Sequence, residues 1–562
     1  MERFKNSLYA RQVFWGSPVT FGVARVLLAL LLLVDVLRRW PDLDVWYTNA
    51  GLMPNHTMLW APQAKLGFSI FYGVSELHEA RFFVGLIVLV YLGLLLGWKT
   101  KLMQLLALAA QLSLNCRIHY LTNGGDNALS VLLVWTAFLP LGEWLSIDSL
   151  RRAMRHSKLN VDKKHVATLE IDPAHASFVS PPTPRFEWAV GAMAAQLAVI
   201  YFFNYIHKDT DGWREGRVLL DVLHQNRIAT AAAEWFRPHL TPTMSLVMTR
   251  MAQATEATLP ILVLWPALKV RRLAIIAGIG LHVGFAFFLN LGVFSYAMMM
   301  FWVFLIPHED MARILSRVFG KRVEPEATVG PELDRWSAHA WLCLQHRAVS
   351  AVPAFALRRI KAISARFKLE KNEPEPFSPD SPARAAWLRF RVHVNHTLFA
   401  FMAVVFLIQT SAQNRAVPPA LKIDPPFWVV WPVEYLHFFQ GWGMFAVSPR
   451  DDSTVVVRAQ TVDGRLVDPL SERASPRSPP GMSAILTRLD HDEYWCDYLS
   501  RIANDRPYEA PLKEWILRYP RRTGRPQDQI VSFDVVQLTQ TSPWYGETVP
   551  TNQKERVLIH YP

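Results

Sequence analysis

The sequence is poor in cysteine, with three residues, Cys116, Cys343 and Cys496, among 562. They lie far apart and form no CxxC pair, so neither a disulfide framework nor a cysteine zinc site is expected. The short motifs of common catalytic sites are also missing from the sequence: HExxH, the P-loop, the dinucleotide-binding glycine fingerprint and the GxSxG nucleophile elbow. We therefore expect no metal site. The chemistry left open is proton transfer at a lysine, or simple binding.

Charged residues make up only 19% of the chain, whereas 51% of it is hydrophobic and the mean hydropathy is +0.12. A soluble domain rarely carries so many long apolar runs, so the sequence predicts an integral membrane protein with additional aqueous mass. The net charge of +12 does not indicate nucleic-acid binding. Much of the Lys and Arg lies in loops between apolar runs, where membrane topology accounts for it.

Nine apolar runs predict an α-helical integral membrane bundle of about nine spans. They lie at 20–38, 82–98, 101–120, 127–145, 186–206, 244–268, 272–292, 293–307 and 391–411. Several are shorter than the roughly 20 residues that an upright span needs, which indicates tilted helices or imprecise boundaries. The run at 293–307 is the weakest of the nine.

Basic residues gather in alternate gaps between these runs, which predicts that those gaps are cytoplasmic. The residues concerned are Arg3, Lys5, Arg11, Lys99, Lys101, Arg151, Arg152, Arg155, Lys158, Lys163, Lys164, Lys269, Arg271 and Arg272, and segment 308–388 is basic as well. With an odd number of spans, the N-terminus is then cytoplasmic and the C-terminus periplasmic. Lys208 falls on the periplasmic side.

The composition divides the chain into four parts. Residues 1–307 form the predicted bundle with eight spans, and 389–411 form the last span. Between them, 308–388 is predicted as a cytoplasmic loop with an amphipathic helix at 336–367 and a proline-rich hinge. Residues 412–562 are predicted as a β-rich extramembrane module.

Alternating residues identify the strands of that module. Thr454 to Arg458 and Arg465 to Val467 flank an Asp463-Gly464 turn, which is a hairpin signal. Further strands are expected at 530–538 and 556–560, with a more helical stretch at 494–519.

The most informative polar stretch is FFNYIHKDTDGWREG, residues 202–216, where His207 and Lys208 follow an apolar run. An ionisable pair at the mouth of a span is a functional-site hypothesis, because burying such groups in lipid is costly. The alternative is a lysine that only snorkels to the headgroups. Desolvation would lower the pKa of Lys208, whereas Asp209 and Asp211 would raise it unless they point to water.

Three further polar residues stand in apolar surroundings: His282, Glu256 and Asp126. Each has a structural alternative: a histidine bonded to a neighbouring carbonyl, a glutamate paired with Arg250, and an aspartate in a turn that caps a helix. Polar groups in membranes usually face one another. We therefore expect Lys208, Asp126 and His282 to approach one outward-facing pocket.

Three motifs carry a family resemblance. HKDTDGWREG and HVGFAFFLNLGVFSYAMM resemble the lysine and histidine segments of vitamin K-dependent gamma-glutamyl carboxylases. The stretch LSLNCRIHYLTNGGDNALSVLLVWTAFLPLGEWLSID is similar to their bacterial branch, the HTTM (horizontally transferred transmembrane domain) proteins. The resemblance covers roughly residues 10–307, and more weakly the QGWGMFAVSP segment and the tail.

The resemblance implies a lyase-like enzyme whose substrates are a reduced naphthoquinone, O2 and CO2. The family is thought to deprotonate the quinol with its lysine, generate a strong base with dioxygen, and carboxylate a glutamyl γ-carbon while an epoxide leaves. Lys208 is then the base and His282 a catalytic pocket residue, and His207, Trp213, Asp126 and Glu256 are expected to line the quinone site. A bacterial inner membrane is the expected location.

One departure concerns carboxylation. Where the carboxylases have an Asn-His pair, this chain has Gly125-Asp126, and an anionic aspartate would repel a carbanion unless it is protonated. Two other functions therefore stay open. One is a non-catalytic maturation or immunity-type protein that binds a periplasmic peptide or a lipid. The other is a transporter, disfavoured because no repeat or Gly/Pro-broken span pair is visible.

Overall fold

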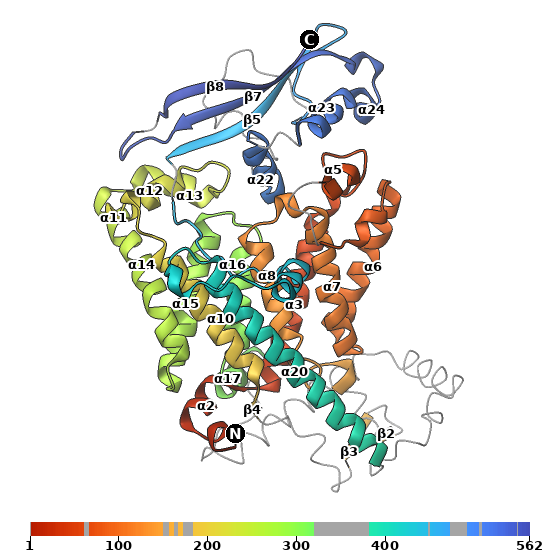
Figure 1. Ribbon diagram of the computed structural model, residues 1–562, viewed down its shortest axis with the longest axis vertical. Helices are drawn as coiled ribbons and strands as arrows, with labels where there is room; N and C mark the ends of the chain where they lie inside the picture. The colour runs from red at the N-terminus through yellow and green to blue at the C-terminus, as the bar shows by residue number, and fades with distance from the viewer. Residues whose placement is uncertain are drawn as a thin grey trace.

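A computed structural model describes residues 2–60, 67–149, 157–161, 167–171, 184–319, 382–447, 450–471, 492–504, 508–547 and 549–562. A helical bundle forms most of the molecule, and a β-sheet lies across one end of it (Figure 1). The N-terminus lies at the opposite end of the bundle from the C-terminus (Figure 1). This arrangement matches the predicted combination of a helical bundle and a C-terminal β-rich module.

Each of the nine predicted runs coincides with a helix of the bundle. These are α3 (Pro18–Arg38), α6 (Leu77–Leu96), α7 (Thr100–Arg117), α8 (Gly124–Thr136), α10 (Trp188–Ile206), α14 (Pro242–Leu264), α15 (Leu268–Phe288), α16 (Phe294–Phe304) and α20 (Pro382–Gln413). Local signals start and stop them. Ser17 and Thr241 cap α3 and α14 through their side chains, each followed by proline, and Gly97 ends α6 with φ +67°.

The predicted number of nine spans is wrong. Among the described residues, five helices are long and apolar enough to cross a membrane: Pro18–Trp46, Leu77–Leu96, Trp188–Ile206, Leu268–Phe288 and Ala385–Gln413. The helices α8 and α16 have only 13 and 11 residues. Helix α7 carries Gln104, Gln111 and Asn115, all buried inside the protein. Apolar runs therefore marked helices of the bundle correctly, but several of them are packed among other helices and are short or partly polar.

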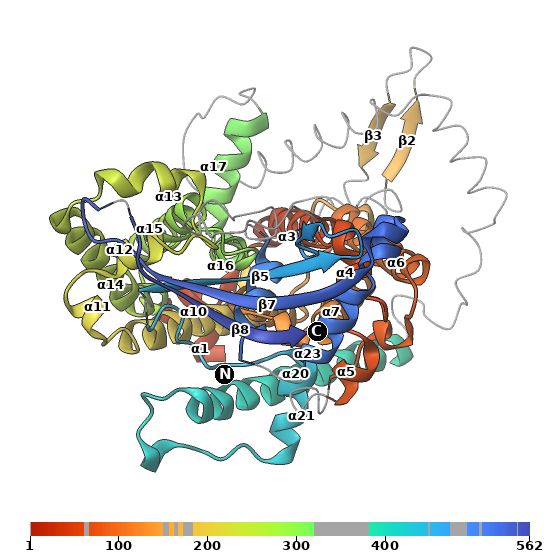
Figure 2. The ribbon, with the colours of Figure 1, turned by 90° about the horizontal axis from the view of Figure 1, so that it is seen from above.

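The C-terminal module contains a four-stranded antiparallel sheet in the order β6-β5-β7-β8. Its strands are β5 (Asp451–Thr461), β6 (Leu466–Val467), β7 (Ile530–Thr541) and β8 (Thr551–Tyr561). Gly464, with φ +79°, makes the turn between β5 and β6, so the predicted hairpin is confirmed. In the view from above, strands β5, β7 and β8 lie across the helices of the bundle (Figure 2).

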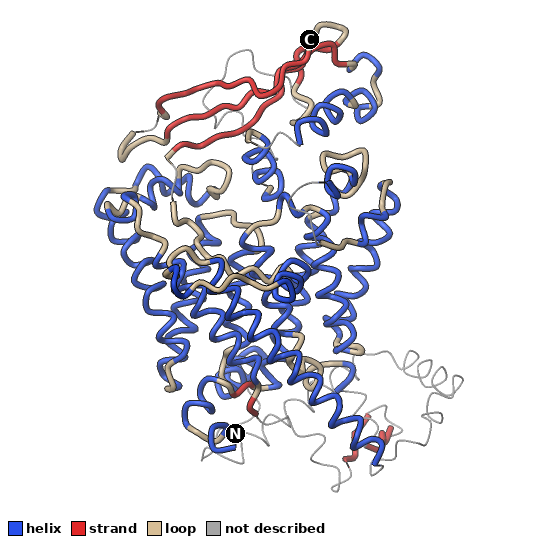
Figure 3. The backbone as a smooth tube through the Cα atoms, viewed as in Figure 1, coloured by secondary structure: helices blue, strands red, loops and turns tan. Residues whose placement is uncertain are grey.

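Two helices of the module pack against the sheet: α22 (Glu493–Ile502) and α23 (Glu509–Leu517), as predicted for this stretch. Figure 3 shows α22 between the red strands of the sheet and the blue helices of the bundle. Trp495 of α22 packs on Trp46 of the bundle, with ring centroids 4.8 Å apart. Trp46 is thus buried against the module.

Several segments connect these parts. The apolar helix α21 (Phe427–Leu436) and the loop that follows it return the chain to the bundle, which the sequence did not predict. Short helices α11 (Asp211–Arg214), α12 (Val218–Leu223) and α13 (Ala231–Phe236) lie beneath the sheet (Figure 1). At the other end are α17 (His308–Phe319) and the antiparallel pair β2 (Ser157–Val161) and β3 (Ala167–Ile171). The amphipathic helix and hinge predicted after residue 320 lie outside the described residues.

Candidate functional site

Lys208 lies two residues beyond the end of α10 and points into the protein. Its Nζ donates hydrogen bonds to both carboxylate oxygens of Glu256, which projects from α14. The two side chains are 3% and 4% exposed, so the ion pair is almost completely withdrawn from water. The partner suggested for Glu256 from sequence, Arg250, instead donates to Gln253 and to the Arg214 carbonyl.

The acids that follow Lys208 point away from it. The Asp209 and Asp211 side chains are 76% and 82% exposed, and both pair with Arg214. Burial lowers the pKa of the Lys208 amine, and the neighbouring Glu256 carboxylate opposes this shift. The two aspartates therefore face water, as the sequence analysis required for a lowered pKa of Lys208. A different acid, Glu256, opposes that shift instead.

Trp213 also contacts the amine. Nζ of Lys208 lies 4.7 Å from the Trp213 ring centroid, within the range of a cation–π contact. The indole Nε1 donates to the carbonyl of Phe445 at 2.8 Å, which holds the ring in place. The short helix α11 thus brings the predicted tryptophan to the predicted lysine.

His282 of α15 belongs to the same buried region. The hydroxyl of Tyr201 and the Nε2 atom of His282 are 2.8 Å apart, and Trp302 Nε1 donates to that hydroxyl at 3.0 Å. His282 is 1% exposed, and its Nδ1 atom has no hydrogen-bond partner among the described residues. A buried imidazole with one free nitrogen, next to the lysine and glutamate, can accept or orient a polar group of a ligand.

These side chains enclose a small cavity, of about 10 Å³, which is room for about one water molecule. Its polar lining consists of Lys208, Glu256, His282, Tyr201 and Asn204. The remaining lining is apolar and comes from Ile200, Phe285, Phe294, Met298, Met444 and Phe445. The result is a small chamber with one ion pair and one hydrogen-bonded imidazole in largely apolar surroundings.

A C-terminal segment, Trp442–Ala446, closes this chamber. His207 Nδ1 lies 2.8 Å from the carbonyl of Trp442, and the Met444 amide donates to the Asn204 side chain at 2.9 Å. Phe445 has φ +56°, a left-handed conformation that is costly for a residue with a side chain. We call residues 442–446 the cover segment. His207 therefore contacts the cover segment and does not line the chamber.

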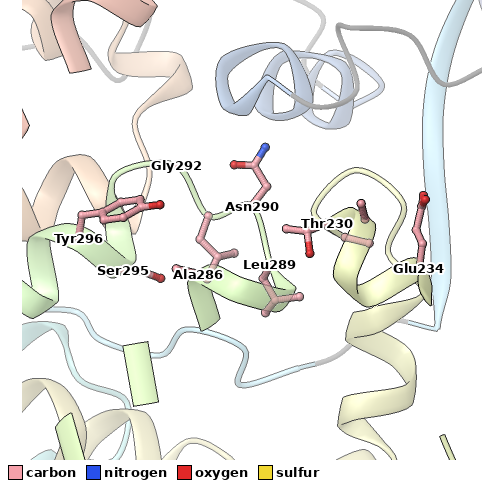
Figure 4. Close-up of a pocket in the computed structure, with 11 residues that line it drawn as sticks. Thr230, Glu234, Ala286, Leu289, Asn290, Gly292, Ser295 and Tyr296 are labelled. Carbon is pink, nitrogen blue, oxygen red and sulfur yellow. The ribbon is translucent and has the colours of Figure 1, made fainter. Parts of the chain in front are cut away.

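A larger cavity, of about 320 Å³, is lined in part by the sequence neighbours of residues that line the chamber (Figure 4). Ala286 and Ser295 line this larger cavity, whereas the preceding residues, Phe285 and Phe294, line the chamber. Figure 4 shows Ser295 and Leu289 on opposite sides of Ala286, with Thr230 and Glu234 across from them on the α13 side. The Ser295 hydroxyl is buried and has no hydrogen-bond partner among the described residues.

Asp126 does not lie in the chamber. It forms a capping box with Asn123 at the start of α8, as the structural alternative proposed. Its carboxylate also lies 3.4 Å from Nη2 of Arg39 and accepts from the Tyr494 hydroxyl at 3.4 Å. The expectation that Asp126 shares a pocket with Lys208 and His282 is corrected, because its carboxylate is held by Arg39, Tyr494 and the cap of α8.

Sequence reasoning missed Tyr201 and Asn204, and it singled out the cover segment only within the QGWGMFAVSP stretch, without placing it over Lys208. Tyr201 and Asn204 lie in the same apolar run as the predicted site, seven and four residues before Lys208, and helical spacing could have placed them on its face. The cover segment is more than 200 residues away in sequence, so no local pattern connects it with Lys208. Among the described residues, no group of three or more His, Cys, Asp or Glu side chains could hold a metal ion.

Comparison of the chain with protein-family models, with curated proteins and with solved structures finds no match in any of the three.

Proposed function

We propose that this protein is a membrane enzyme in which the Lys208 amine acts as a base toward a reduced naphthoquinone in a water-poor chamber. The motifs that resemble gamma-glutamyl carboxylases suggest this chemistry. The observation that carries the proposal is the buried pair of Lys208 and Glu256. Ionisable groups at such a depth are costly to maintain, and they are common where a protein moves protons.

The chemical character of the chamber lining suits a quinol. Phe285, Phe294 and Met298 offer an apolar surface for a fused ring, while Lys208 and His282 offer polar contacts for its hydroxyl groups. The chamber volume of about 10 Å³ is too small for the ring, so binding requires the cover segment or the Phe285–Phe294 wall to move. The neighbouring cavity of about 320 Å³ has the size of a small-molecule site and would receive the ligand first.

The roles of the residues follow from their contacts. A neutral Lys208 amine can accept a proton from a quinol hydroxyl, and Glu256 can hold the proton that the ion pair shares when the amine is neutral. Tyr201 and Trp302 orient the His282 ring, and the cover segment excludes water. The bound quinol, with O2, would supply the strong base that the family is thought to use on a glutamyl γ-carbon, to which CO2 adds.

The carboxylation half is not assigned to Asp126. Its carboxylate is occupied by Arg39, Tyr494 and its own helix cap, and it does not line the chamber. We propose proton abstraction at the quinol as the core activity, with glutamyl carboxylation of a periplasmic peptide as the coupled step. The proposed location is a bacterial inner membrane, with the C-terminal module on the periplasmic side.

The test uses the purified full-length chain in detergent or lipid, with reduced naphthoquinone, oxygen and bicarbonate. Formation of quinone epoxide, lost in Lys208→Met and retained in Lys422→Ala, supports the proposal. Lys422 is exposed and lies outside the chamber, so it controls for loss of a positive charge. No epoxide from the wild type, or equal amounts from wild type and Lys208→Met, contradicts it.

The second candidate is a binding protein without catalysis, a maturation or immunity-type protein for a peptide or lipid. It is favoured by the larger cavity, which contains a buried serine hydroxyl without a partner. Under this function, the wild type would form a detectable complex with a peptide or lipid and produce no epoxide. Ser295→Val would weaken that complex, whereas Lys208→Met would leave it unchanged.

A further inference from the structure

Arg117, the last residue of α7, is a buried cation that has no counter-charge among the residues the structure describes. It is 0% exposed, and its hydrogen bonding to the described protein consists of one long bond, from Nη2 to the Thr48 carbonyl at 3.4 Å. Its Nε and Nη1 atoms have no hydrogen-bond partner among the described residues. No described carboxylate forms an ion pair with it.

The other buried arginines of the described bundle each donate hydrogen bonds to at least two acceptors. Arg25 donates to the carbonyls of Leu94 and Leu95 at 2.6 and 2.9 Å, and also to that of Leu145. Arg39 bonds Asp35 at 2.7 Å and Tyr47 at 3.0 Å, and Arg271 donates to the carbonyls of Leu305, at 2.9 Å, and Gln12. The fold therefore satisfies buried guanidinium groups with several acceptors, and Arg117 is the exception among the described residues.

The groups nearest to Arg117 do not supply an anion. The hydroxyls of Tyr47 and Tyr72 are close enough to interact with its charge, but each is neutral and has another partner. His119, two residues further on, is near enough to feel the guanidinium and has a buried Nε2 without a partner. The His119 Nδ1 atom lies 3.4 Å from the Cys116 carbonyl and donates to it, so the free Nε2 atom can donate to an anion only when the ring is protonated.

A bound anion would stabilise the buried Arg117 guanidinium. A guanidinium remains charged in proteins, so it cannot escape burial by losing its proton. Removing such a charge from water is costly, and the negative dipole end of the α7 C-terminus offsets only a small part of that cost. A bound anion would compensate the remainder and use the unpartnered N–H groups.

We propose that Arg117 forms a binding site, beside His119, for a small monovalent anion, chloride or a carboxylate. The site lies where α7 ends beside α22, because Arg501 of α22 donates to the carbonyls of Tyr120 and Thr122 just after it. A small anion fits the single guanidinium charge, whereas a dianion would leave buried negative charge. Binding there would tie the loop around Thr48 to the end of α7.

The test is anion-dependent stability of the full-length chain in detergent. The protein is exchanged into sodium isethionate, whose anion is bulky, and sodium chloride or sodium acetate is titrated in at constant ionic strength. We expect the wild-type unfolding temperature to rise by roughly 5 °C at saturation. The rise should disappear in Arg117→Met and persist in Arg518→Met, a partly exposed arginine on the same side of the protein.

The two salts distinguish the source of the anion. A rise with chloride alone indicates a free inorganic ion, and a rise with acetate indicates a carboxylate, the group that a peptide would supply. No rise with either salt, or an equal rise in Arg117→Met, overturns the proposal. If Arg117→Met does not fold, wild-type crystals grown in bromide provide the answer: an anomalous peak beside residue 117 is expected, and its absence overturns the site.

Discussion

Lys208, just beyond the end of α10, meets Glu256 of α14 inside the bundle, where the amine bonds both carboxylate oxygens. With the two side chains 3% and 4% exposed, each group is the other's main compensation for lost hydration. Removing one partner of such a pair destabilises a protein strongly, whereas replacing both partners by apolar residues changes its stability little. Comparing single and double variants therefore measures the contribution of the pair to stability, independently of any catalytic role.

The first prediction is a double-mutant cycle. Lys208→Met or Glu256→Leu alone should lower the free energy of unfolding by about 3–5 kcal/mol, because each leaves an unpaired buried group. The double variant should recover most of that loss, because two apolar side chains fill the same space. Chemical denaturation in detergent measures all three variants. Additive losses in the double variant would show that the two groups do not interact.

The second prediction concerns the cover segment. Phe445→Gly should relieve the left-handed backbone at φ +56° but remove a wall of the chamber, so Lys208 becomes accessible. Amine-reactive labelling of Lys208, followed by mass spectrometry, should increase several-fold. The control is Leu145→Gly, which changes another residue with positive φ, 52°, outside the chamber. Equal labelling of Lys208 in both variants would contradict the covering role.

The third prediction concerns the hydroxyl of Tyr201. Tyr201→Phe leaves His282 Nε2 and Trp302 Nε1 without their shared partner, so the free energy of unfolding should fall by about 1–3 kcal/mol. Tyr205→Phe, at an exposed position one turn further along α10, should change it little. Thermal or denaturant unfolding compares the two. A smaller loss in Tyr201→Phe than in Tyr205→Phe would exclude the hydrogen-bonded chain.

The fourth prediction is a pH dependence at the junction of the bundle and the C-terminal module. Burial raises the pKa of Glu493 to about 7, Asp126 adds to this shift, and Arg38 and Asn123 oppose it. Because the folded pKa exceeds the ordinary value, the stabilising contribution of Glu493 is complete below about pH 4.5 and is lost as pH rises through 7. Burial also raises the pKa of Asp497, which shares Asn123, so both acids act in the same direction.

Hydrogen exchange of α22, corrected for intrinsic rates, measures this effect. Protection should decrease between pH 5 and pH 8 in the wild type, and the decrease should become smaller in Glu493→Gln. Glu509→Gln, an acid of α23 outside this junction, should retain the full dependence. Protection that rises with pH, or an unchanged slope in Glu493→Gln, would contradict the assignment.

The site was partly predictable. The apolar run before His207 and Lys208 marked the position of the lysine, and Trp213 follows it closely enough for a short turn to bring the two together. His282 and Glu256 were recognised because polar residues are costly in apolar surroundings. That Glu256 is the partner of Lys208, and that Asp126 instead pairs with Arg39, depended on which helix faces meet.

The sequence by itself determined the helical bundle, the hairpin around Gly464 and the approximate ends of the helices, because periodicity, caps and turn residues act over a few neighbouring positions. It overstated the number of spans, since an apolar run predicts burial without distinguishing lipid from protein surroundings. Only the tertiary structure decided that Met444 and Phe445 close the chamber of Lys208, and that Arg117 is buried with no acid partner in the described part of the chain. Contacts between residues hundreds of positions apart arise from packing, which no local pattern encodes.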